Sequence, residues 1–204
     1  SKEQLFIFDT TLRDGAQTQG VDFSVDDKLK IALALDNLGV DYIEGGWPGA
    51  NPTDTEFFQK KHSFNNAKLT SFGMTKKTGR SADNDPGLSA LLNSNTPAVC
   101  IVGKSWDFHV DIALGISNEE NLENIKETAK HFVKENKEFM FDAEHFFDGY
   151  KANPNYALSC LKAAFDEGAR WIVLCDTNGG TLPHEVSKII TEVSKTIPGK
   201  NLGI

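Results

Sequence analysis

Short apolar runs that end in glycine or an acidic residue recur along this chain, and helix-like segments separate them. The runs are rich in β-branched and aromatic residues and almost continuous in apolar side chains, which is typical of strands buried on both faces. They occupy residues 5–9, 41–46, 68–73, 98–103, 139–144 and 171–176. One strand and one helix in roughly every 30–40 residues indicate βαβ units and a parallel sheet.

Capping residues mark where the intervening helices begin. The predicted starts lie at or beside Ser24, Thr53, Asp85, Ser117, Asn153 and Pro183. Ser24 precedes an apolar stripe from Leu29 to Leu38 that stops at Gly39. Thr53 and Ser117 are each followed three residues later by glutamate, which is the capping-box pattern. The stretches 74–85 and 104–116 are predicted to be long irregular loops, and such loops are usually functional.

Two parallel architectures fit this order, an open doubly wound sheet and a (β/α)₈ barrel. The first run is followed by TTLRDG (10–15), which lacks the GxGxxG pattern of the doubly wound fold. Polar residues end runs one, two, five and six, and a barrel collects its chemistry at that end. We therefore predict a TIM (β/α)₈ barrel, truncated after about six βα units and the start of strand seven at 200–204. Residues 1–204 would be the N-terminal part of a single catalytic barrel domain.

Charge and cysteine content narrow the class of protein. The formal charge of −8, from 21 basic and 29 acidic residues, disfavours a general binder of nucleic acid or anionic membranes. No apolar run approaches the length of about 18 residues that a membrane span needs. Cys100, Cys160 and Cys175 are widely spaced and are interpreted as reduced core thiols. Without a recognisable export signal, we expect a cytoplasmic protein.

An arginine and an aspartate lie side by side after the first predicted strand, and Glu44 closes the second. One interpretation places Asp14 on a divalent metal and Arg13 on a substrate carboxylate or a developing enolate. The other is a structural ion pair at the barrel rim. Glu44 is either a rim acid or the group that orients Arg13.

Polar residues also end the fifth and sixth predicted strands. Asp142 and Glu144 point the same way by period-2 alternation. They serve as acid–base groups, as metal ligands or as partners of Arg13, or else they form hydrogen bonds with the neighbouring loops. Thr177 and the glycines after it either bind a carboxylate or form a turn that needs positive φ. His109 and His145 are candidates for proton transfer.

The densest basic cluster in the first half is Lys76, Lys77 and Arg80, in the loop after the third strand. It either contacts nucleotide phosphates or is a solvated loop. The histidines lack HxxxH and HxH spacing, so the sequence contains no zinc-type motif. His131 falls on a predicted helix and is expected to face solvent.

The motifs DTTLRDGAQ, IEGGWPGANP, FDAEHFFDGYKANP and LCDTNGGTLP together resemble the DRE-TIM metallolyases. This family contains the 2-isopropylmalate, homocitrate and citramalate synthases, with 3-hydroxy-3-methylglutaryl-CoA lyase as a relative, and the second and third motifs are most similar to the citramalate synthase branch. The resemblance implies condensation of acetyl-CoA with a 2-keto acid, one divalent metal (Mn²⁺, Mg²⁺ or Zn²⁺), thioester hydrolysis and a homodimer at full length. Pyruvate is the favoured keto acid, with 2-ketoisovalerate and 2-ketoglutarate as alternatives.

Roles in the first two strands follow from the resemblance. It implies that Asp14 is the metal ligand and that Arg13 stabilises the keto-acid or enolate oxygen. It also implies that Gln17 lines the site and that Glu44 is the acid near the arginine.

At the later strands, the resemblance implies that Glu144 is the catalytic acid and that Thr177 holds the keto-acid carboxylate. The family takes two further metal ligands from a His-x-His motif at the end of strand seven, and residues 1–204 do not contain one. We therefore expect these residues alone to bind metal weakly and to be inactive. A hydroxy-acyl-CoA lyase of the same barrel and a non-catalytic fragment that binds partners through its open sheet edge are the alternatives.

Overall fold

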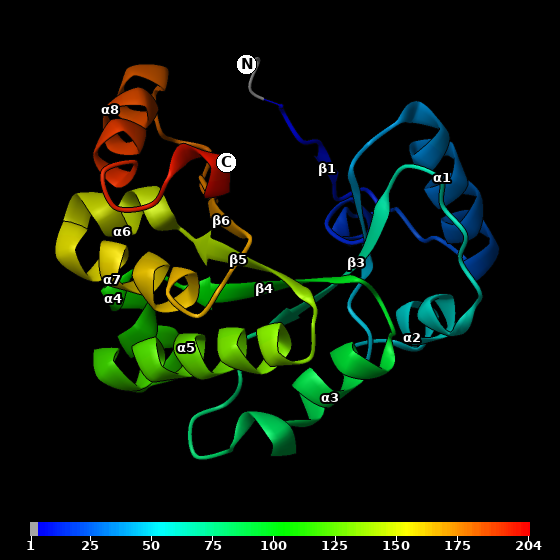
Figure 1. Cartoon of the computed structure of the whole chain (residues 1–204), viewed down its shortest axis with the longest axis horizontal. Helices are drawn as coiled ribbons and strands as arrows, with labels where there is room; N and C mark the ends of the chain where they lie inside the picture. The colour runs from blue at the N-terminus through cyan, green and yellow to red at the C-terminus, as the bar shows by residue number, and fades with distance from the viewer. Residues whose placement is uncertain (1–3) are drawn as a thin grey trace. The chain divides into compact units, whose positions relative to one another are not determined.

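The computed structural model describes residues 4–204, which divide into two compact units. The described part of the first unit comprises residues 4–73 and 89–100, and the second unit comprises residues 74–88 and 101–204. The strands are β1 (Phe8–Asp9), β2 (Tyr42–Gly46), β3 (Lys68–Met74), β4 (Ala98–Lys104), β5 (Glu138–Glu144), β6 (Trp171–Leu174) and β7 (Leu202–Gly203) (Figure 1). They are hydrogen-bonded to one another in chain order, and the β1–β2, β2–β3, β5–β6 and β6–β7 pairs are parallel.

Helices separate the strands as the βαβ pattern requires. The α-helices are α1 (Val25–Leu38), α2 (Pro52–Gln59), α3 (Pro86–Asn93), α4 (Asp107–His109), α5 (Asn118–Lys134), α6 (Phe146–Ala152), α7 (Pro154–Phe165) and α8 (Pro183–Val193). Short 3₁₀ turns lie at η1 (Gly15–Gln17), η2 (Ala82–Asn84) and η4 (Gly199–Asn201), and η3 (Val110–Leu114) is a π-helix. None of the helices within residues 4–204 has the length and apolar content needed to cross a bilayer.

In the first unit, α1 and α2 pack against β2 and against each other. All five residues of β2 are buried, so this strand supplies the centre of the unit. The core consists of Leu12, Ala32, Val40, Ile43, Phe57, Phe58 and Leu69. Ile43, from the middle of β2, and Phe57, from α2, are completely inaccessible to solvent.

In the second unit, α5 and α7 pack against each other and against β5, and α6 packs against α7 (Figure 1). The core is rich in aromatic rings, each at most 1% exposed: Phe132, Phe139, Phe141, Phe146 and Phe147. Gly103 in β4 lies so close to Phe141 that an added Cβ would come within 2.6 Å of the ring. A glycine there lets the ring of β5 lie against the backbone of β4.

The structure confirms the six predicted strands, and β7 is the predicted start of a seventh. β1 is shorter than the run 5–9, because only Phe8 and Asp9 pair with β2. Leu5 and Ile7, which precede it, are 82% and 50% exposed. Cys100 and Cys160 are buried free thiols as predicted, whereas the free thiol Cys175 is only half-buried.

Three of the predicted helix caps are confirmed, and the one at Thr53 is wrong. Ser24, Ser117 and Asn153 cap α1, α5 and α7, and their side-chain oxygens accept backbone N–H groups of the first turn. The Thr53 prediction is wrong: α2 is capped by Asn51, whose side chain accepts the N–H of Asp54. The prolyl ring at position 52 then occupies the first turn, where its missing N–H costs nothing.

Other sequence predictions are corrected by the structure. The stretch 104–116 contains α4 and the π-helix η3 instead of an irregular loop, and α6 was not predicted. Leu38, placed in the apolar stripe of α1, is 77% exposed because it lies in the last turn. His131 does not face solvent: its side chain is 9% exposed, and Nδ1 lies 3.2 Å from Asp83 Oδ1.

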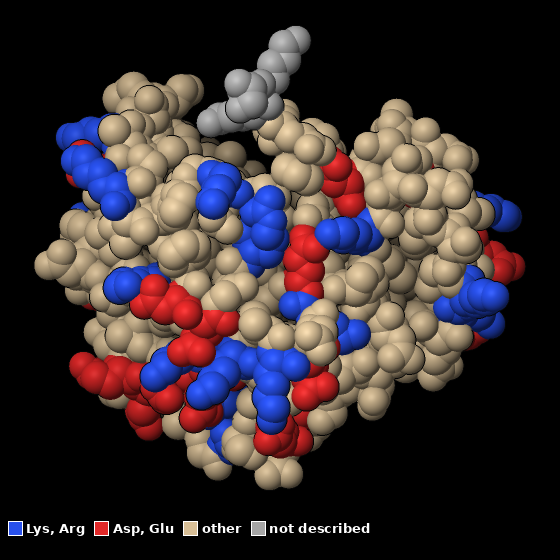
Figure 2. All heavy atoms as spheres, in the orientation of Figure 1, with Lys and Arg blue, Asp and Glu red and all other residues tan. Residues whose placement is uncertain are grey.

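Basic and acidic side chains lie beside one another across the face drawn in Figure 2. The ion pair of Lys76 joins an almost buried lysine to Glu127, whose side chain is 41% exposed. The Lys76 side chain is 7% exposed, and its Nζ lies 2.7 Å from Glu127 Oε2 and donates to the carbonyl oxygen of Arg80 at 2.7 Å. The solvated-loop interpretation of the basic cluster therefore fails for Lys76, although Lys77 and Arg80 are exposed.

Candidate active site

In the first unit, the guanidinium of Arg13 and the carboxylate of Glu44 form a close pair. Arg13 Nε donates to Glu44 Oε2 at 2.7 Å. The Glu44 side chain is fully buried, and the Arg13 side chain is 15% exposed. The pairing arises because β1 and β2 are parallel neighbours, so the turn after β1 and the end of β2 lie at the same edge. Glu44 therefore contacts Arg13 directly, which is the arrangement that one of the two sequence interpretations requires.

Further contacts hold the outer part of the same guanidinium. Its carbon lies 3.9 Å above the centre of the Phe72 ring, a cation–π contact. Nη1 donates to Asp14 Oδ1 at 3.2 Å and reaches Gln17 Oε1 at 3.5 Å, the limit of a hydrogen bond. Burial acts to lower the pKa of Arg13, but Glu44 and then Asp14 outweigh it and raise that pKa. The cation is thus fixed in place and permanently charged.

A cleft of about 350 Å³ opens beside this arginine within the first unit. Its lining includes Arg13, Gln17, Lys28, Trp47, Asn51 and Asp54. Asp14 beside the cleft is 65% exposed, so its carboxylate retains capacity for a further partner. The fixed cation of Arg13 in the cleft wall suits a small anionic ligand, and the accessible carboxylate of Asp14 contacts that cation.

In the second unit, Glu144 at the end of β5 is paired with Lys104 at the end of β4. Lys104 Nζ donates to Glu144 Oε2, and the two side chains are 22% and 26% exposed. The hydroxyl of Ser105 donates to the carbonyl oxygen of Glu144 at 2.8 Å. Both the side chain and the backbone of Glu144 are therefore fixed by consecutive residues of the neighbouring strand end.

The residue after Glu144 links the ends of β5 and β6. His145 has a φ of 51°, in the left-handed region where few non-glycine residues occur. Its backbone N–H donates to Thr177 Oγ1 at 2.9 Å. Its Nδ1 lies 3.4 Å from Asp148 Oδ2, and that oxygen also accepts from Asn178 Nδ2 at 2.8 Å. Strained backbone of this kind is concentrated at functional sites.

A second histidine stands beside the first. The rings of His109 and His145 meet edge to face with their centres 4.7 Å apart, and Trp106 lies 4.6 Å from His109. Burial lowers the pKa of His109, as do His145 and Lys104, while Glu144 and Asp148 partly oppose the shift. His109 is therefore biased toward its neutral form, in which one ring nitrogen accepts a proton.

The six predicted site residues thus form two groups. Arg13, Asp14, Gln17 and Glu44 belong to the first unit, and Glu144 and Thr177 belong to the second, where His145 connects them. The sequence interpretation missed Phe72, Lys104 and Asp148. Lys104 carried a usable signal, because it immediately follows the predicted strand 98–103, whereas nothing in the sequence singles out Phe72. Gly179 has a φ of 65°, so the turn after Thr177 does need a glycine.

Comparison with known proteins agrees with this architecture. The chain is 54% identical over 204 residues to the (R)-citramalate synthase of Aquifex aeolicus, covering 99% of this chain and 39% of that protein. It is 33% identical over 192 residues to the 2-isopropylmalate synthase of Sediminispirochaeta smaragdinae, covering 94% of this chain and 37% of that protein. The chain spans about two fifths of the length of these curated relatives.

The fold is also shared with solved structures. The HMG-CoA lyase of Bacillus subtilis superposes with a TM-score of 0.80 at 17% identity, covering 98% of this chain and 67% of that one. This likeness confirms the fold class that the strand and helix order predicted, a TIM-barrel architecture. The HMGL-like family model matches residues 4–204. The resemblance read from the four motifs is thereby confirmed, and the chain belongs to the HMGL-like family.

Proposed function

We propose that the protein carrying this sequence condenses acetyl-CoA with pyruvate to give citramalate. The observation that carries the proposal is the buried Glu44 carboxylate that holds Arg13 beside an accessible Asp14. The 54% identity to an (R)-citramalate synthase, against 33% to a 2-isopropylmalate synthase, favours pyruvate over 2-ketoisovalerate.

The reaction joins the methyl carbon of acetyl-CoA to the ketone carbon of pyruvate. The methyl group loses a proton, the ketone oxygen gains one, and water then cleaves the C–S bond of the thioester. The products are citramalate, CoA and a proton. A negative charge develops on the ketone oxygen during C–C bond formation, so the enzyme must stabilise an oxyanion.

We assign that stabilisation to Arg13. Its Nε is engaged by Glu44, and its carbon is fixed over Phe72, so the remaining N–H groups are aimed by the protein and need little reorganisation. Gln17, at the outer edge of the same guanidinium, is proposed to line the keto-acid pocket. Glu44 is proposed to act by orienting the arginine.

Asp14 is proposed to hold the divalent cation. Its donor atoms are hard oxygens, which suit Mg²⁺ or Mn²⁺, and its 65% exposed side chain leaves room for a cation. When bound, the cation would polarise the ketone and so make its carbon electrophilic. Asp14 also contacts Arg13 directly, so the residue that would hold the cation and the residue proposed to stabilise the oxyanion are adjacent.

Glu144 is proposed to move the proton of the condensation step. The side chain is partly exposed and fixed by Lys104 and Ser105, so it is accessible to a substrate and does not rotate freely. Thr177 is proposed to bind the pyruvate carboxylate. Because its oxygen accepts the N–H of His145, its own O–H remains available to donate.

The test is a keto-acid-dependent assay of CoA release by the metal-loaded protein that carries this sequence. Pyruvate should give a higher kcat/KM than 2-ketoisovalerate or 2-ketoglutarate, and citramalate should be identified by mass spectrometry. Arg13→Lys should reduce kcat/KM by roughly a hundredfold or more, because lysine cannot reproduce the fixed fork of donors. The control Lys195→Arg conserves the charge of a side chain that is 65% exposed and should leave activity unchanged.

Other results would redirect the proposal. Preference for 2-ketoisovalerate would indicate a 2-isopropylmalate synthase, and cleavage of a hydroxy-acyl-CoA without net condensation would indicate a lyase. No activity with any of these substrates would contradict the enzymatic assignment. We further propose that a polypeptide limited to these 204 residues does not turn over, that the full-length protein is a homodimer, and that it is cytoplasmic. Light scattering tests the assembly.

A further inference from the structure

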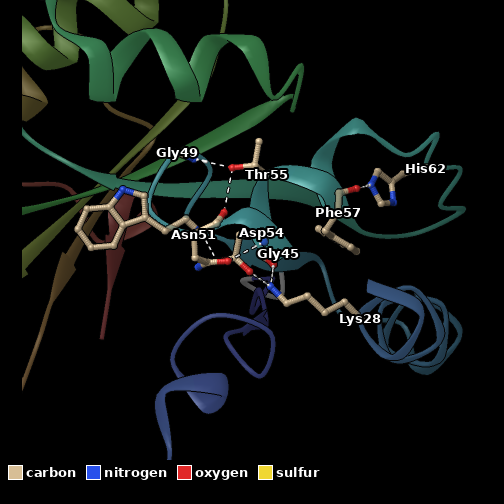
Figure 3. A network of polar contacts seen from close by, with 9 residues as sticks. Lys28, Gly45, Gly49, Asn51, Asp54, Thr55, Phe57 and His62 are labelled. Carbon is tan, nitrogen blue, oxygen red and sulfur yellow. Dashed lines mark hydrogen bonds and ion pairs between the residues drawn. The ribbon is translucent and has the colours of Figure 1, made fainter. Parts of the chain in front are cut away.

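A buried ion pair between α1 and α2 of the first unit forms part of the lining of the candidate cleft (Figure 3). Lys28 Nζ donates to Asp54 Oδ1, and the two side chains are 2% and 11% exposed. Lys28 Nζ also donates to the carbonyl oxygen of Gly45 at 2.8 Å. The other oxygen of Asp54 accepts the N–H of Trp47 at 2.8 Å and Nδ2 of Asn51 at 2.9 Å. The ion pair therefore forms hydrogen bonds with the backbone on both sides of Gly46, to the carbonyl of Gly45 and the N–H of Trp47.

The backbone at the end of β2 that this ion pair contacts is irregular. Glu44 pairs with Thr70 of β3, and Gly46 pairs with Ser71, so Gly45 is an extra residue that forms a β-bulge. A bulge disrupts the ladder locally and re-aims neighbouring side chains, and bulges are common next to active sites. Here the bulge directly follows Glu44, the residue that orients Arg13.

The same segment passes unusually close to α2. A Cβ added to Gly45 would come within 2.6 Å of the Phe57 ring, and one added to Gly46 would come within 2.5 Å of Asp54 Cγ. Gly46 also has a φ of +146°, a conformation that favours glycine. The bulge is therefore held against Asp54 by shape as well as by hydrogen bonds.

A need for stability alone does not explain an ion pair at this position. Replacing a buried ion pair by apolar side chains of similar volume is often neutral or stabilising, so a contribution to stability does not by itself account for such a pair. Lys28 and Asp54 bond the two peptide groups that flank Gly46, which begin one residue after Glu44. One of these belongs to Trp47, whose ring packs against Phe72 at 5.3 Å, the ring beneath the Arg13 guanidinium.

We infer that Lys28 and Asp54 are positioning residues that fix the bulge after Glu44 and thereby set both the Arg13 guanidinium and the Trp47 wall of the keto-acid pocket. The inference rests on the proposed function for its substrate, because Arg13 and Trp47 line the cleft in which the keto acid would bind. Neither residue of the pair needs to touch the reacting atoms.

The first experiment removes the charges but keeps the volume, with the double variant Lys28→Met/Asp54→Leu. We expect a variant that still folds cooperatively, with a lower Tm because the Gly45 carbonyl and the Trp47 N–H lose their partners. Its kcat/KM for the 2-keto acid should fall by roughly tenfold to a hundredfold, because a misplacement of an oriented group by about 1 Å has an effect of this size. The KM for acetyl-CoA should be unchanged. The matched control is Glu56→Gln/Lys60→Gln, which removes an exposed ion pair from the end of the same helix α2 and should alter none of these values.

A second readout follows the arginine directly. The Nε–H signal of Arg13 in a ¹⁵N spectrum, assigned by its loss in Arg13→Lys, should shift in the double variant and stay in place in the control. A pair that only stabilised the fold would leave this signal unmoved. An unmoved signal together with unchanged kinetics in a folded double variant would overturn the inference.

A third measurement remains if the double variant does not fold. Amide hydrogen exchange of the unaltered protein should show the N–H of Trp47 protected well above that of an exposed loop amide, because Asp54 accepts it. Rapid exchange of that amide would contradict the inference. If the unaltered protein consumes no 2-keto acid, the proposed function fails, while the Nε–H shift and the exchange of Trp47 still decide the positioning role.

Discussion

Replacing Glu44 by glutamine tests whether the buried carboxylate is what holds Arg13. The substitution keeps the size of the side chain and one carbonyl oxygen that can still accept Arg13 Nε–H. It removes the negative charge from a side chain that has no solvent exposure. The guanidinium keeps Asp14 as a partner, but at 3.2 Å and on a side chain that is 65% exposed.

The expected decrease in the free energy of unfolding follows from these contacts. Leaving a buried charge without its partner typically costs about 3–5 kcal/mol. Arg13 is 15% exposed, and the glutamine oxygen still accepts its N–H, so the loss should approach that of one charge-assisted hydrogen bond, about 1.5–3 kcal/mol. We expect about 2 kcal/mol, which corresponds to a Tm roughly 4–8 °C lower for a chain of this size.

Urea unfolding at neutral pH measures the difference in the free energy of unfolding, and steady-state kinetics measure the effect on the proposed reaction. Glu56→Gln is the matched control, because Glu56 pairs with Lys60 on the surface, where the two side chains are 55% and 47% exposed. It should change stability by no more than about 0.5 kcal/mol. If Glu44→Gln costs no more than this control and leaves kcat/KM intact, Glu44 does not hold Arg13.

Three further predictions concern other parts of the chain. Burial acts to raise the pKa of Asp36, but hydrogen bonds from three backbone N–H groups outweigh it and lower that pKa below 3.8. Its ionised form therefore stabilises the fold above pH 3.8 and loses this effect as pH falls through the lower native pKa. Urea unfolding should show Asp36→Asn costing about 1.5–3 kcal/mol at pH 7 and progressively less in acid. Gly46→Ala should lower the free energy of unfolding by about 2 kcal/mol or more in thermal melts, because of its positive φ and because the added Cβ would lie 2.5 Å from Asp54 Cγ. Gly15→Ala, whose Cβ meets nothing closer than 3.8 Å, should be tolerated. Lys104→Met should lower kcat by roughly tenfold, with partial recovery in Lys104→Arg, if Lys104 positions Glu144 for proton transfer.

Each of these predictions has a contradicting result. An Asp36 effect that is constant from neutral to acid pH would mean that the ionised carboxylate is not the stabilising group. Equal melting temperatures for the two alanine variants would remove the steric argument at Gly46. An unchanged kcat for Lys104→Met would separate Lys104 from the proposed chemistry.

The strands were predictable because the signal for each lies within a few consecutive residues. A strand buried on both faces needs an almost continuous apolar run, and the six runs show it directly. The caps at Ser24 and Ser117 were predictable for the same reason, since each serves its own first turn. At α2 two local signals competed, and Asn51 prevailed over Thr53 because a cap there also lets proline occupy the first turn.

The buried charges were not predictable in the same way. Lys28 and Asp36 lie in α1, where a charged residue normally indicates the solvent-facing side, yet they are 1% and 2% exposed. Their partners are far away in sequence: Asp54 for Lys28, and the backbone N–H groups of residues 65–67 for Asp36. Periodicity shows which positions are apolar, but it contains no information on which polar group will meet a compensating one.

The site residues were also predictable only in part. One regularity in the site nevertheless follows from the parallel sheet. In each unit, an acid at the carboxyl end of one strand is paired with a cation that follows the neighbouring strand: Glu44 of β2 with Arg13 after β1, and Glu144 of β5 with Lys104 at the end of β4. Parallel strands bring their carboxyl ends to one edge, so the sequence predicted where these acids lie. Which cation reaches which acid depends on the register between strands and on local departures such as the bulge at Gly45. A bulge of one residue is enough to re-aim a side chain. The polar groups that fix that bulge therefore belong to the proposed site as much as the acids do, although they lie in the sequence among residues that resemble an ordinary helix surface.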